Sequence, residues 1–572
     1  MTLPRPKTLK TLLEESVGRF PEKIALAYVE GPSLTYAALG HRVQQLSQFF
    51  QRRGILKGDR IALLGENMPN WGVAYLAITS MGAVVVPILP DFHANEIHHI
   101  LRHSGCKAAV VSEKLLDRVT DADLPDCATL LKLNDLSPVS PQDRRGRLMD
   151  ILREGEREVV KLKESALRLA GKVPDPLLPE DLAAIIYTSG TTGHAKGVML
   201  THKNIVSDVY FTLKIQDMNE RDRLLSILPL SHTYENTLGF LLPLSQGAAV
   251  YYLDKPPVPR VLLPALERIR PTMMLTVPLI IEKIYKTKVL PKLEAPGAMG
   301  RLTRIGGVRK ALVKLIGKKL MQTFGGELRF FGIGGASVSP QVEAFLREAG
   351  FPYAIGYGLT ETAPLIAGSG PALTRALSTG FPLPDVHIRI ADPDPATGEG
   401  EIQIKGDNVM KGYYRDPERT AEVFTADGYF RTGDLGVFDA DGYLYIKGRL
   451  KNVIIGPNGE NIYPEEIETH LNRQDLVLES LAYALDGRIV ARVFLDYDHL
   501  DRQFEKENLS ESAIAGRIAE IMENIRTQVN ASVAANARLH RIIEQKAPFE
   551  KTPTHKIKRF LYTEGGSGNL TA

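Results

Sequence analysis

Cysteine is almost absent from this chain of 572 residues, which contains only Cys106 and Cys127. Two cysteines cannot build a framework of several disulfides or a metal site with several thiolate ligands, so both are excluded. A strong excess of charge is also absent, because 70 lysines and arginines face 67 aspartates and glutamates, which leaves a formal net charge of +3. A protein that coats nucleic acid needs a larger positive excess, so no nucleic-acid partner is expected. The low cysteine content predicts a cytoplasmic protein.

Long apolar runs are scarce as well. The N-terminal segment contains cations but lacks the apolar core of a signal peptide, so no export is expected. Residues 71–90 are uncharged over 20 positions, about the length that crosses a bilayer. One glycine and two prolines divide this run, and the pattern instead predicts a buried helix over 71–81 followed by a β-branched strand at 84–86. A membrane span is therefore not expected.

Hydrophobic residues make up 44% of the chain and charged residues 24%, which is the composition of a globular protein with an ample core. Short runs rich in valine and isoleucine alternate with helical patterns or glycine turns, and this alternation predicts βαβ units with mostly parallel sheets. We expect such strands at residues 59–65, 83–89, 107–112, 182–190, 248–253 and 328–335. The sequence therefore predicts the α/β class.

The pattern changes after about Ile388. Segments separated by Asp-Gly turns indicate antiparallel hairpins, with strands expected at 401–406, 428–433 and 441–448. A helix is then expected over 464–471. Residues 452–572 carry 14 lysines and arginines against 18 aspartates and glutamates, so their net charge is −4. We predict two domains, residues 1–450 and residues 451–572, with the boundary near Lys451.

The segment YTSGTTGHAKG, residues 187–197, follows an apolar strand and contains three glycines, four hydroxyls and Lys196. Glycines permit close backbone approach, hydroxyls donate hydrogen bonds and the lysine adds a cation, a combination that suits a polyphosphate. The segment is not a Walker A loop, because that pattern ends in Gly-Lys-Ser or Gly-Lys-Thr, whereas Gly197 follows Lys196. A surface turn without a ligand would not explain why these residues gather behind a buried strand. The segment predicts a triphosphate-binding loop.

Two further segments could complete a nucleotide site. In IGYGLTETAP, Tyr357 between two glycines could lie against a base, Thr360 could bond a phosphate oxygen, and Glu361 is a carboxylate that suits Mg²⁺. In YFRTGDLG, Asp434 could accept both ribose hydroxyls. Taken alone, either segment could be an ordinary tight turn.

Together with GRLKNVI at 448–454 and EKTPTHKIKRF at 550–560, these segments resemble the adenylate-forming superfamily of acyl-CoA synthetases, adenylation domains and luciferases. Matching segments run from about residue 10 to residue 560. The resemblance implies an α/β fold: a large N-terminal domain with parallel-rich sheets and a β-barrel-like part, and a small mobile α+β C-terminal domain. It also implies ATP-dependent conversion of a carboxylic acid to acyl-AMP with pyrophosphate release, and then transfer to coenzyme A. ATP, Mg²⁺ and coenzyme A are the expected cofactors.

The resemblance also implies which residues bind the nucleotide. The β- and γ-phosphates would be held by Thr188, Ser189, Gly190, Thr191, Thr192, Gly193 and Lys196. The adenine would be enclosed by Gly334, Gly335, Ala336, Ser337, Tyr357 and Gly358. Thr360 would meet the α-phosphate, Glu361 the magnesium, and Asp434 and Arg449 the ribose. This chain has Ala195 where the family usually has proline, which should loosen the phosphate loop but leaves the lysine in place.

The catalytic residues implied by the resemblance are Lys556, Lys196, Thr360, Glu361 and His232. His232 and Tyr234 would sit at the pocket for the carboxylate, although a hydrogen-bonded histidine beside a core strand is an alternative. Lys556 would reach the carboxylate and the α-phosphate during adenylation. The family usually has glycine where this chain has His555, and Lys558 is the alternative lysine.

The small domain is expected to swing between the two half-reactions. The resemblance places its hinge at Lys451. After the swing, the loop that follows would line the tunnel for the thiol, with Gly459, Glu460 and Asn461 as the candidates. Positioning and charge would then carry the chemistry, and no covalent enzyme intermediate is expected.

The segment VPLIIEKIYKTKVL, residues 277–290, is similar to the long-chain fatty acyl members of the superfamily, so a long-chain fatty acid is the expected substrate. Residues 281–320 carry 11 lysines and arginines against 2 acidic residues, spread over apolar spacing. Basic amphipathic segments of this kind are typical of contact with an anionic membrane surface, so peripheral contact at the inner face of the membrane is expected. The alternative is a solvated basic face near the entrance for coenzyme A.

Three other functions stay open at this point. A fatty acyl-AMP ligase or an acyl carrier protein ligase would share the first half-reaction but use another acceptor. A non-catalytic nucleotide-binding or scaffolding protein would keep the fold without turnover, although the charged residues named above count against it. Oxygenation like that of the luciferases is the third. The sequence does not predict the oligomeric state.

Overall fold

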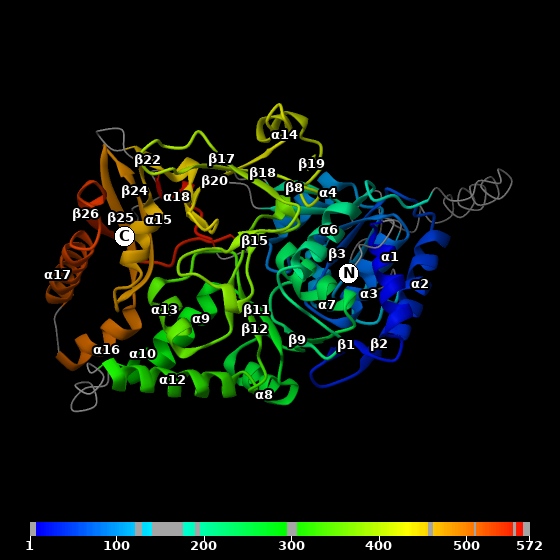
Figure 1. Ribbon diagram of the computed structural model, residues 1–572, viewed down its shortest axis with the longest axis horizontal. Helices are drawn as coiled ribbons and strands as arrows, with labels where there is room; N and C mark the ends of the chain where they lie inside the picture. Colours follow the sequence, from blue (N-terminus) through cyan, green and yellow to red (C-terminus); the bar gives the residue numbers. More distant parts are fainter. Residues whose placement is uncertain are drawn as a thin grey trace.

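The computed structural model describes residues 7–119, 129–139, 176–188, 195–293, 306–455, 461–507, 511–552 and 556–563. Two seven-stranded sheets make up most of the larger part, and a smaller α+β part holds the C-terminal elements at one end of the molecule (Figure 1). The predicted α/β class with a large and a small part is confirmed. The domain limits at residues 450 and 451 stay a prediction.

The first seven-stranded sheet has the order β13-β12-β11-β9-β10-β1-β2, and its pairs are parallel except for β1 with β2. Its strands are β1 (Ile24–Tyr28), β2 (Ser33–Thr35), β9 (Arg223–Ser226), β10 (Ala249–Tyr252), β11 (Met273–Thr276), β12 (Phe330–Ile333) and β13 (Tyr353–Ile355). Apolar side chains of β11 and β12 share one buried cluster with four helices. These helices are α8 (Pro259–Ile269), α9 (Pro278–Ile284), α12 (Gly306–Thr323) and α13 (Pro340–Ala349).

The second seven-stranded sheet has the order β19-β8-β7-β4-β3-β5-β6. Its strands are β3 (Arg60–Leu64), β4 (Val84–Ile88), β5 (Ala108–Val111), β6 (Thr129–Lys132), β7 (Leu182–Thr188), β8 (Lys196–Thr201) and β19 (Gly412–Tyr413). Strand β8 is antiparallel to both of its neighbours, whereas the strands from β7 to β6 run parallel. The reversal at β8 places the beginning of β8 beside the end of β7.

The apolar run at residues 71–90 folds as the sequence predicts. Helix α3 (Pro69–Ser80) has proline in its first turn and is buried along nearly its whole length, and Trp71 stacks on Tyr75. It is followed by the fully buried strand β4. Within the described parts of the chain, no helix combines the length and apolar character needed to cross a bilayer.

Two small antiparallel sheets correspond to the predicted barrel-like part. One contains β14 (Tyr357–Gly358), β15 (Leu365–Gly368) and β16 (Phe381–Pro382), and the other contains β17 (His387–Ala391), β18 (Gly400–Lys405), β20 (Phe430–Phe438) and β21 (Leu444–Arg449). The Asp-Gly turn between β20 and β21 puts Gly442 at a φ of +84°, a left-handed conformation that glycine adopts without strain. This hairpin pairs Asp434 with Arg449 across the two strands.

The C-terminal part has a core of its own. It contains the hairpin β22 (Ile454–Ile455) and β23 (Asn461–Ile462), helices α15 (Pro464–Leu471), α16 (Tyr497–Glu507) and α17 (Glu511–Asn530), and strands β24 (Val477–Leu485), β25 (Arg488–Leu495) and β26 (Arg541–Glu544). Helix α18 (Phe560–Thr563) lies near the end of the chain. Lys451 lies in the short helical turn η8 (Leu450–Asn452), which connects β21 to this part.

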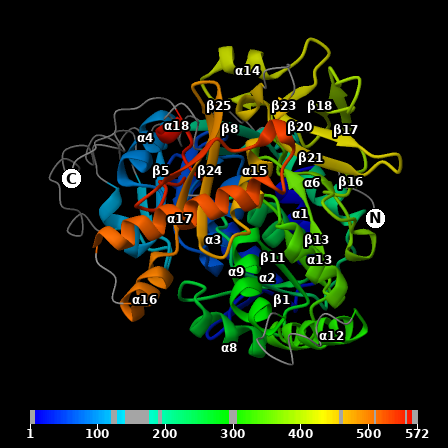
Figure 2. The same cartoon turned by 90° about the vertical axis from the view of Figure 1, so that its left-hand side faces the viewer.

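The remaining elements cover the two large sheets and connect them, as Figure 1 and Figure 2 show. They include α1 (Leu9–Arg19), α2 (Tyr36–Arg52), α4 (Ala94–Ser104), α6 (His202–Leu213), α7 (Leu242–Ser245), α10 (Leu290–Leu293) and α14 (Pro417–Val423). Two π-helical segments, η4 (Tyr234–Leu241) and η5 (Tyr285–Val289), and the 3₁₀ turns η1 (Glu113–Arg118), η6 (Thr360–Thr362), η7 (Pro371–Leu373) and η9 (Ala535–Ala537) complete the set.

Candidate functional site

The predicted phosphate loop connects β7 to β8. The strand pairing puts Thr188, at the end of β7, opposite Lys196, at the beginning of β8. The Oγ1 atom of Thr188 is buried and has no hydrogen-bond partner among the described residues. The predicted loop residues Ser189, Gly190, Thr191, Thr192 and Gly193 lie outside the described residues. The two strands therefore bring one hydroxyl and one cation to the two ends of the loop.

Lys196 forms a triad with a carboxylate and a tyrosine. Its Nζ lies 2.9 Å from Oε1 of Glu361 and donates to the hydroxyl oxygen of Tyr413 at 2.6 Å. The Tyr413 hydroxyl in turn donates to Oε1 of Glu361 at 2.9 Å. Burial alone would raise the pKa of Glu361, but the charge of Lys196 and the hydrogen bonds from Lys196, Tyr413 and the backbone together hold that pKa below its usual value. Glu361 is therefore a buried, ionised carboxylate beside the ends of the phosphate loop.

A second triad is built on the hairpin of β20 and β21. Nε of Arg449 lies 2.6 Å from Oδ1 of Asp434, and the hydroxyl of Tyr357 donates to Oδ2 of Asp434 at 2.7 Å. Burial raises the pKa of Asp434, while Arg449 and Tyr357 oppose that rise. Both oxygens of Asp434 are thus hydrogen-bonded, and the Tyr357 ring is fixed next to the predicted ribose site.

Lys556 brings a cation from the C-terminal part to these triads. The residue is exposed to solvent. Burial by the surrounding protein and the charge of Arg449 lower the pKa of Lys556, whereas Asp434 and Glu361 act in the opposite direction. The described parts of the two domains therefore meet at one electrostatic cluster.

His232 lies within the influence of Lys556. Burial, followed by the charge of Lys556, lowers the pKa of His232 to about 4, so its imidazole is neutral at pH 7. Its Nδ1 accepts a hydrogen bond of 3.2 Å from the backbone N–H of Tyr234. The histidine is thus hydrogen-bonded, as the alternative interpretation expects, and its place at the carboxylate pocket stays a prediction.

Gly332, in β12, and Gly334, directly after it, pack against Tyr234. A Cβ atom added at Gly334 would lie 3.1 Å from the Tyr234 ring, and one added at Gly332 would lie 3.2 Å from its hydroxyl oxygen. Gly335 has a φ of +88°, and Ala336 and Ser337 follow it in an exposed turn. The small residues let this turn approach the Tyr234 side chain, on the side of the cluster where the adenine is predicted.

An apolar cavity begins at Tyr234. The cavity is narrow, with a volume of about 50 Å³, and none of the lining side chains is charged. Tyr234 and Gly332 line it together with Leu238, Met273, Leu275 and Phe330. Tyr234 thus lines the cavity, and its backbone N–H donates to His232, whose pKa is lowered by the charge of Lys556. The arrangement joins an apolar space to a group of cations and carboxylates.

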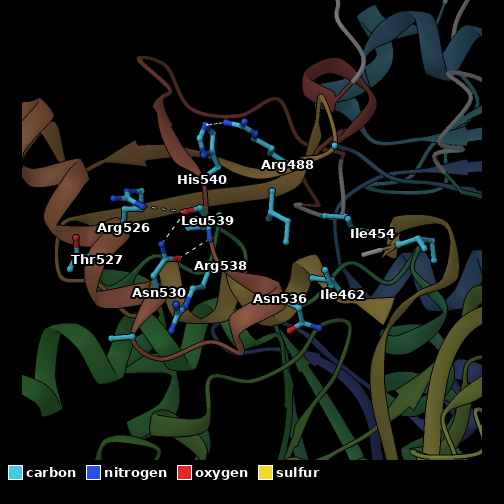
Figure 3. Close-up of a pocket in the computed structure, with 14 residues that line it drawn as sticks. Ile454, Ile462, Arg488, Arg526, Thr527, Asn530, Asn536, Arg538, Leu539 and His540 are labelled. Atoms are coloured by element: carbon cyan, nitrogen blue, oxygen red, sulfur yellow. Dashed lines mark hydrogen bonds between the residues drawn. The ribbon is translucent and has the colours of Figure 1, made fainter. Parts of the chain in front are cut away.

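A larger hollow lies in the C-terminal part, beside the hairpin of β22 and β23 (Figure 3). It has a volume of about 710 Å³, and its charged lining comes from Arg488, Arg526, Arg538 and His540. Hydrogen bonds within the lining connect Arg488 to His540 at 2.8 Å and Arg526 to the Leu539 carbonyl at 3.4 Å. None of the predicted nucleotide residues lines this hollow.

The structure brings together most of the predicted residues that it describes. These are Thr188, Lys196, His232, Tyr234, Gly334, Gly335, Tyr357, Gly358, Thr360, Glu361, Asp434, Arg449 and Lys556. The alternative lysine, Lys558, instead faces Glu550 at 3.9 Å. His555, Gly459 and Glu460 lie outside the described residues. Their roles, and those of the residues brought together, stay predictions.

Sequence reasoning missed two residues of the site. Tyr413 completes the first triad, and Thr432 accepts a hydrogen bond of 3.0 Å from the backbone N–H of Asp434. The tyrosine follows Gly412 in the short strand β19, which pairs with β8. A glycine followed by two aromatic residues was the signal available in the sequence, but nothing local connects it to Lys196.

The fold and this cluster define a two-part α/β enzyme whose parts both contribute to one group of cations, carboxylates and tyrosines. The family model described as AMP-binding enzyme matches residues 13–414. The chain belongs to the AMP-binding enzyme family, which confirms the resemblance seen in the sequence.

Among its relatives, long-chain-fatty-acid--CoA ligase 1 of Cavia porcellus is 31% identical over 510 residues, which is 82% of this chain and 71% of that protein. Long-chain-fatty-acid--CoA ligase FadD15 of Mycobacterium bovis is 29% identical over 91% of this chain and 88% of its own length.

Solved structures agree with the fold. ATP-bound MatB from Rhodopseudomonas palustris superposes with a TM-score of 0.72 at 25% identity, covering 98% of each chain. MenE from Bacillus subtilis in complex with AMP, an O-succinylbenzoate coenzyme A synthetase, superposes with a TM-score of 0.72 at 22% identity, covering 98% of this chain and 99% of that one. The second likeness concerns the fold alone.

Proposed function

We propose that the protein is an AMP-forming acid–CoA ligase that activates a long-chain fatty acid. The observation that carries this proposal is the junction at Tyr234, which lines an uncharged apolar cavity and donates its backbone N–H to His232, a residue within the electrostatic influence of Lys556. Family membership and the relatives named as long-chain-fatty-acid--CoA ligases support it. An acid with an apolar tail has one end suited to each half of this junction.

The cluster would hold ATP by its charges. The predicted phosphate loop begins at Thr188 and ends beside Lys196, so the β- and γ-phosphates would lie between them. Asp434 and Arg449 would hold the ribose, and Tyr357 would lie against the adenine. Its depressed pKa keeps Glu361 anionic, which fits a magnesium ligand that shares the ion with phosphate oxygens, and the bound ion would supply positive charge there.

In the first half-reaction, an oxygen of the substrate carboxylate would attack the α-phosphorus, and pyrophosphate would leave with the electrons of the broken P–O bond. The main cost is the crowding of negative charge, because a carboxylate must approach a phosphate. Lys556 and Lys196 would offset that charge, and His232, neutral at pH 7, would line the approach of the carboxylate without adding charge. Positioning two bound reactants supplies the rest of the acceleration.

In the second half-reaction, the thiol of coenzyme A would attack the acyl carbon, and AMP would leave. Lys451 is the proposed hinge for the rearrangement, because it lies in the turn η8 between β21 and the C-terminal part. The proposed division into residues 1–450 and 451–572 follows from the same position. Asn461, in β23, is the one of the three predicted tunnel residues that the structure describes.

The lining of the cavity supports an acid with one carboxylate and an apolar tail. O-succinylbenzoate carries a second carboxylate, and a buried second anion would need a cation beside it. The cavity offers no charged side chain, and Leu238, Met273 and Phe330 contribute apolar atoms. This distinction favours a fatty acid over the dicarboxylate named for MenE, although the two chains share a fold.

The test is ATP-dependent pyrophosphate release by the purified protein with a series of acids from acetate to long-chain and aromatic acids, each with and without coenzyme A. We expect release to peak with long-chain acids and to continue for many turnovers only when coenzyme A is present. Release that stops after about one turnover despite coenzyme A would replace this proposal with a fatty acyl-AMP ligase or an acyl carrier protein ligase. Oxygen uptake in the presence of the adenylate would indicate oxygenation.

A cytoplasmic location with peripheral contact at the inner face of the membrane is also proposed. Of residues 281–320, the structure describes 281–293 and 306–320, and these include most of α9, all of α10 and most of α12. The outer face of α12 is the part of this segment whose exposed side chains support contact with lipid.

A further inference from the structure

Helix α12 has two apolar stripes, one buried and one exposed. The buried stripe contains Val313, Ile316 and Leu320, which pack into the core behind β11 and β12. On the opposite side of the helix, Val308 is 40% exposed and Leu315 is 65% exposed. A helix that only covers a core needs one apolar stripe and has polar residues on its other side. The second stripe of α12 is therefore in excess of what the fold requires.

The exposed stripe is surrounded by positive charge. Helix α12 contains Arg309, Lys310, Lys314, Lys318 and Lys319 and no acidic residue. Arg309 faces Glu348 at 3.3 Å. Within the described part of the chain, the four lysines form no ion pair with a carboxylate within 4.0 Å, and all four are exposed. Their charges are therefore available to an external anionic surface.

Helix α8 extends this face. Figure 1 and Figure 2 both place α8 and α12 along the same edge of the molecule, and the two helices are in contact. Val258, immediately before α8, is 42% exposed, and Leu263 in α8 is 48% exposed. Arg260 lies between them in sequence, and Glu267 is the one acidic residue of this helix. Four exposed apolar side chains thus share one edge with at least five exposed cations.

We propose that α8 and α12 form a docking face that rests on the surface of an anionic lipid bilayer. A bilayer surface supplies acidic headgroups for the lysines and an apolar boundary for Val308, Leu315, Val258 and Leu263 at the same time. Nucleic acid would use the charges but would leave the apolar stripe in water. This face is separate from the charged cluster, and the inference does not depend on the reaction that the cluster catalyses.

The docking face and the acyl cavity lie on opposite sides of the same sheet. Along β11, Met273 and Leu275 line the cavity, whereas Met274 packs in the cluster that holds α12. Alternate residues of a strand point to opposite faces, and a layer of this kind is about 10 Å thick. Docking through α12 would therefore leave only the helix and the sheet between the lipid surface and the cavity.

The experiment is sedimentation of the full chain with vesicles of phosphatidylcholine alone and of phosphatidylcholine mixed with phosphatidylglycerol, at low and at high salt. We expect binding to the mixed vesicles at low salt. A triple variant of the docking face, K314Q/K318Q/K319Q, should bind about 100-fold more weakly, because each lysine near such a surface contributes about a factor of 5. A second variant, Leu315→Ser, tests the apolar stripe and should weaken binding most at high salt, where charges are screened.

The matched control removes three exposed lysines from other faces, K10Q/K114Q/K546Q, and should bind like the parent chain. All four proteins should release pyrophosphate from a soluble short acid at the same rate, which shows that each is folded. Equal binding by the parent chain and the docking-face variant would overturn the proposal, as would failure of the parent chain to bind mixed vesicles. Binding to RNA in place of vesicles, or equal loss in the control variant, would also overturn it.

Discussion

Replacing Lys556 with alanine removes the cation that the C-terminal part contributes to the charged cluster. The ammonium lies within the electrostatic reach of Asp434, Glu361 and Arg449, which is where negative charge must gather during adenylation. A preorganised charge or donor at such a position typically contributes a factor of about 100 to 1000 in rate, or roughly 3 to 4 kcal/mol. We therefore expect Lys556→Ala to slow acid-dependent pyrophosphate release by about that factor.

The two half-reactions separate a chemical role from a structural one. Thioester formation from a supplied acyl adenylate should change much less in Lys556→Ala, because the bond to the α-phosphate is already made. Lys558→Ala is the control, since its ammonium faces Glu550 at 3.9 Å. Equal loss of both half-reactions in Lys556→Ala, or an equal loss of pyrophosphate release in Lys558→Ala, would contradict the assigned role.

A spectroscopic measurement tests the same placement without turnover. Burial is the main cause that lowers the pKa of His232 to about 4, and the charge of Lys556 adds to it. Removal of that charge should raise the pKa of His232, whereas burial should keep it below the ordinary value of about 6.5. An NMR titration of the histidine in both proteins measures this change. An unchanged pKa would show that Lys556 does not approach His232 in solution.

Three further predictions concern other parts of the site. Tyr413→Phe removes hydrogen bonds to both Lys196 and Glu361, so we expect the KM for ATP to rise about 10-fold. An unchanged KM would mean that the triad does not position the nucleotide. Gly332→Ala adds a Cβ that would come within 2.8 Å of a side chain lining the cavity, so activity with long acids should fall more than activity with short ones. An equal fall would mean that the cavity does not bind the acyl chain. Burial raises the pKa of Glu235 to about 8, above its value of about 4.5 in the unfolded chain, so its contribution to stability is lost as pH rises from about 4.5 to about 8. The free energy of unfolding, measured with urea, should therefore fall less across this pH range in Glu235→Gln than in the parent chain, by an amount on the order of 3 to 5 kcal/mol. The same pH dependence in both proteins would refute the raised pKa of Glu235.

Much of the fold could be predicted from the sequence because several of its strands are buried along nearly their whole length. The apolar runs at 59–65, 83–89 and 107–112 fold as β3, β4 and β5. Each of these strands is one residue shorter at each end than predicted, since strand ends depend on pairing with neighbours. The hairpin of β20 and β21 was visible through its Asp-Gly turn.

The site was less predictable because its contacts join residues that are far apart in the sequence. Lys196 and Tyr413 are separated by 217 positions, and Glu361 and Tyr413 by 52. Motifs identified Lys196 and Glu361 as separate candidates, but only the reversal of β8 and its pairing with β19 place them with Tyr413. The exposed stripe on α12 was hidden for another reason: its sequence gives apolar residues on two sides, and burial decides which of them faces the core.

The two triads have the same composition. In each, a carboxylate that is less than a tenth exposed binds a cation and a tyrosine hydroxyl: Glu361 with Lys196 and Tyr413, and Asp434 with Arg449 and Tyr357. Each pair neutralises itself, so the two triads add no net charge. Lys556 then leaves this group with a surplus of three cations over two carboxylates. Burial is the main cause that lowers the pKa of Lys556, and the charge of Arg449 adds to it. A triphosphate bound at this cluster offsets the surplus positive charge, so the pKa of Lys556 should rise when nucleotide binds. The nucleotide should also stabilise the arrangement in which the two parts meet at the cluster.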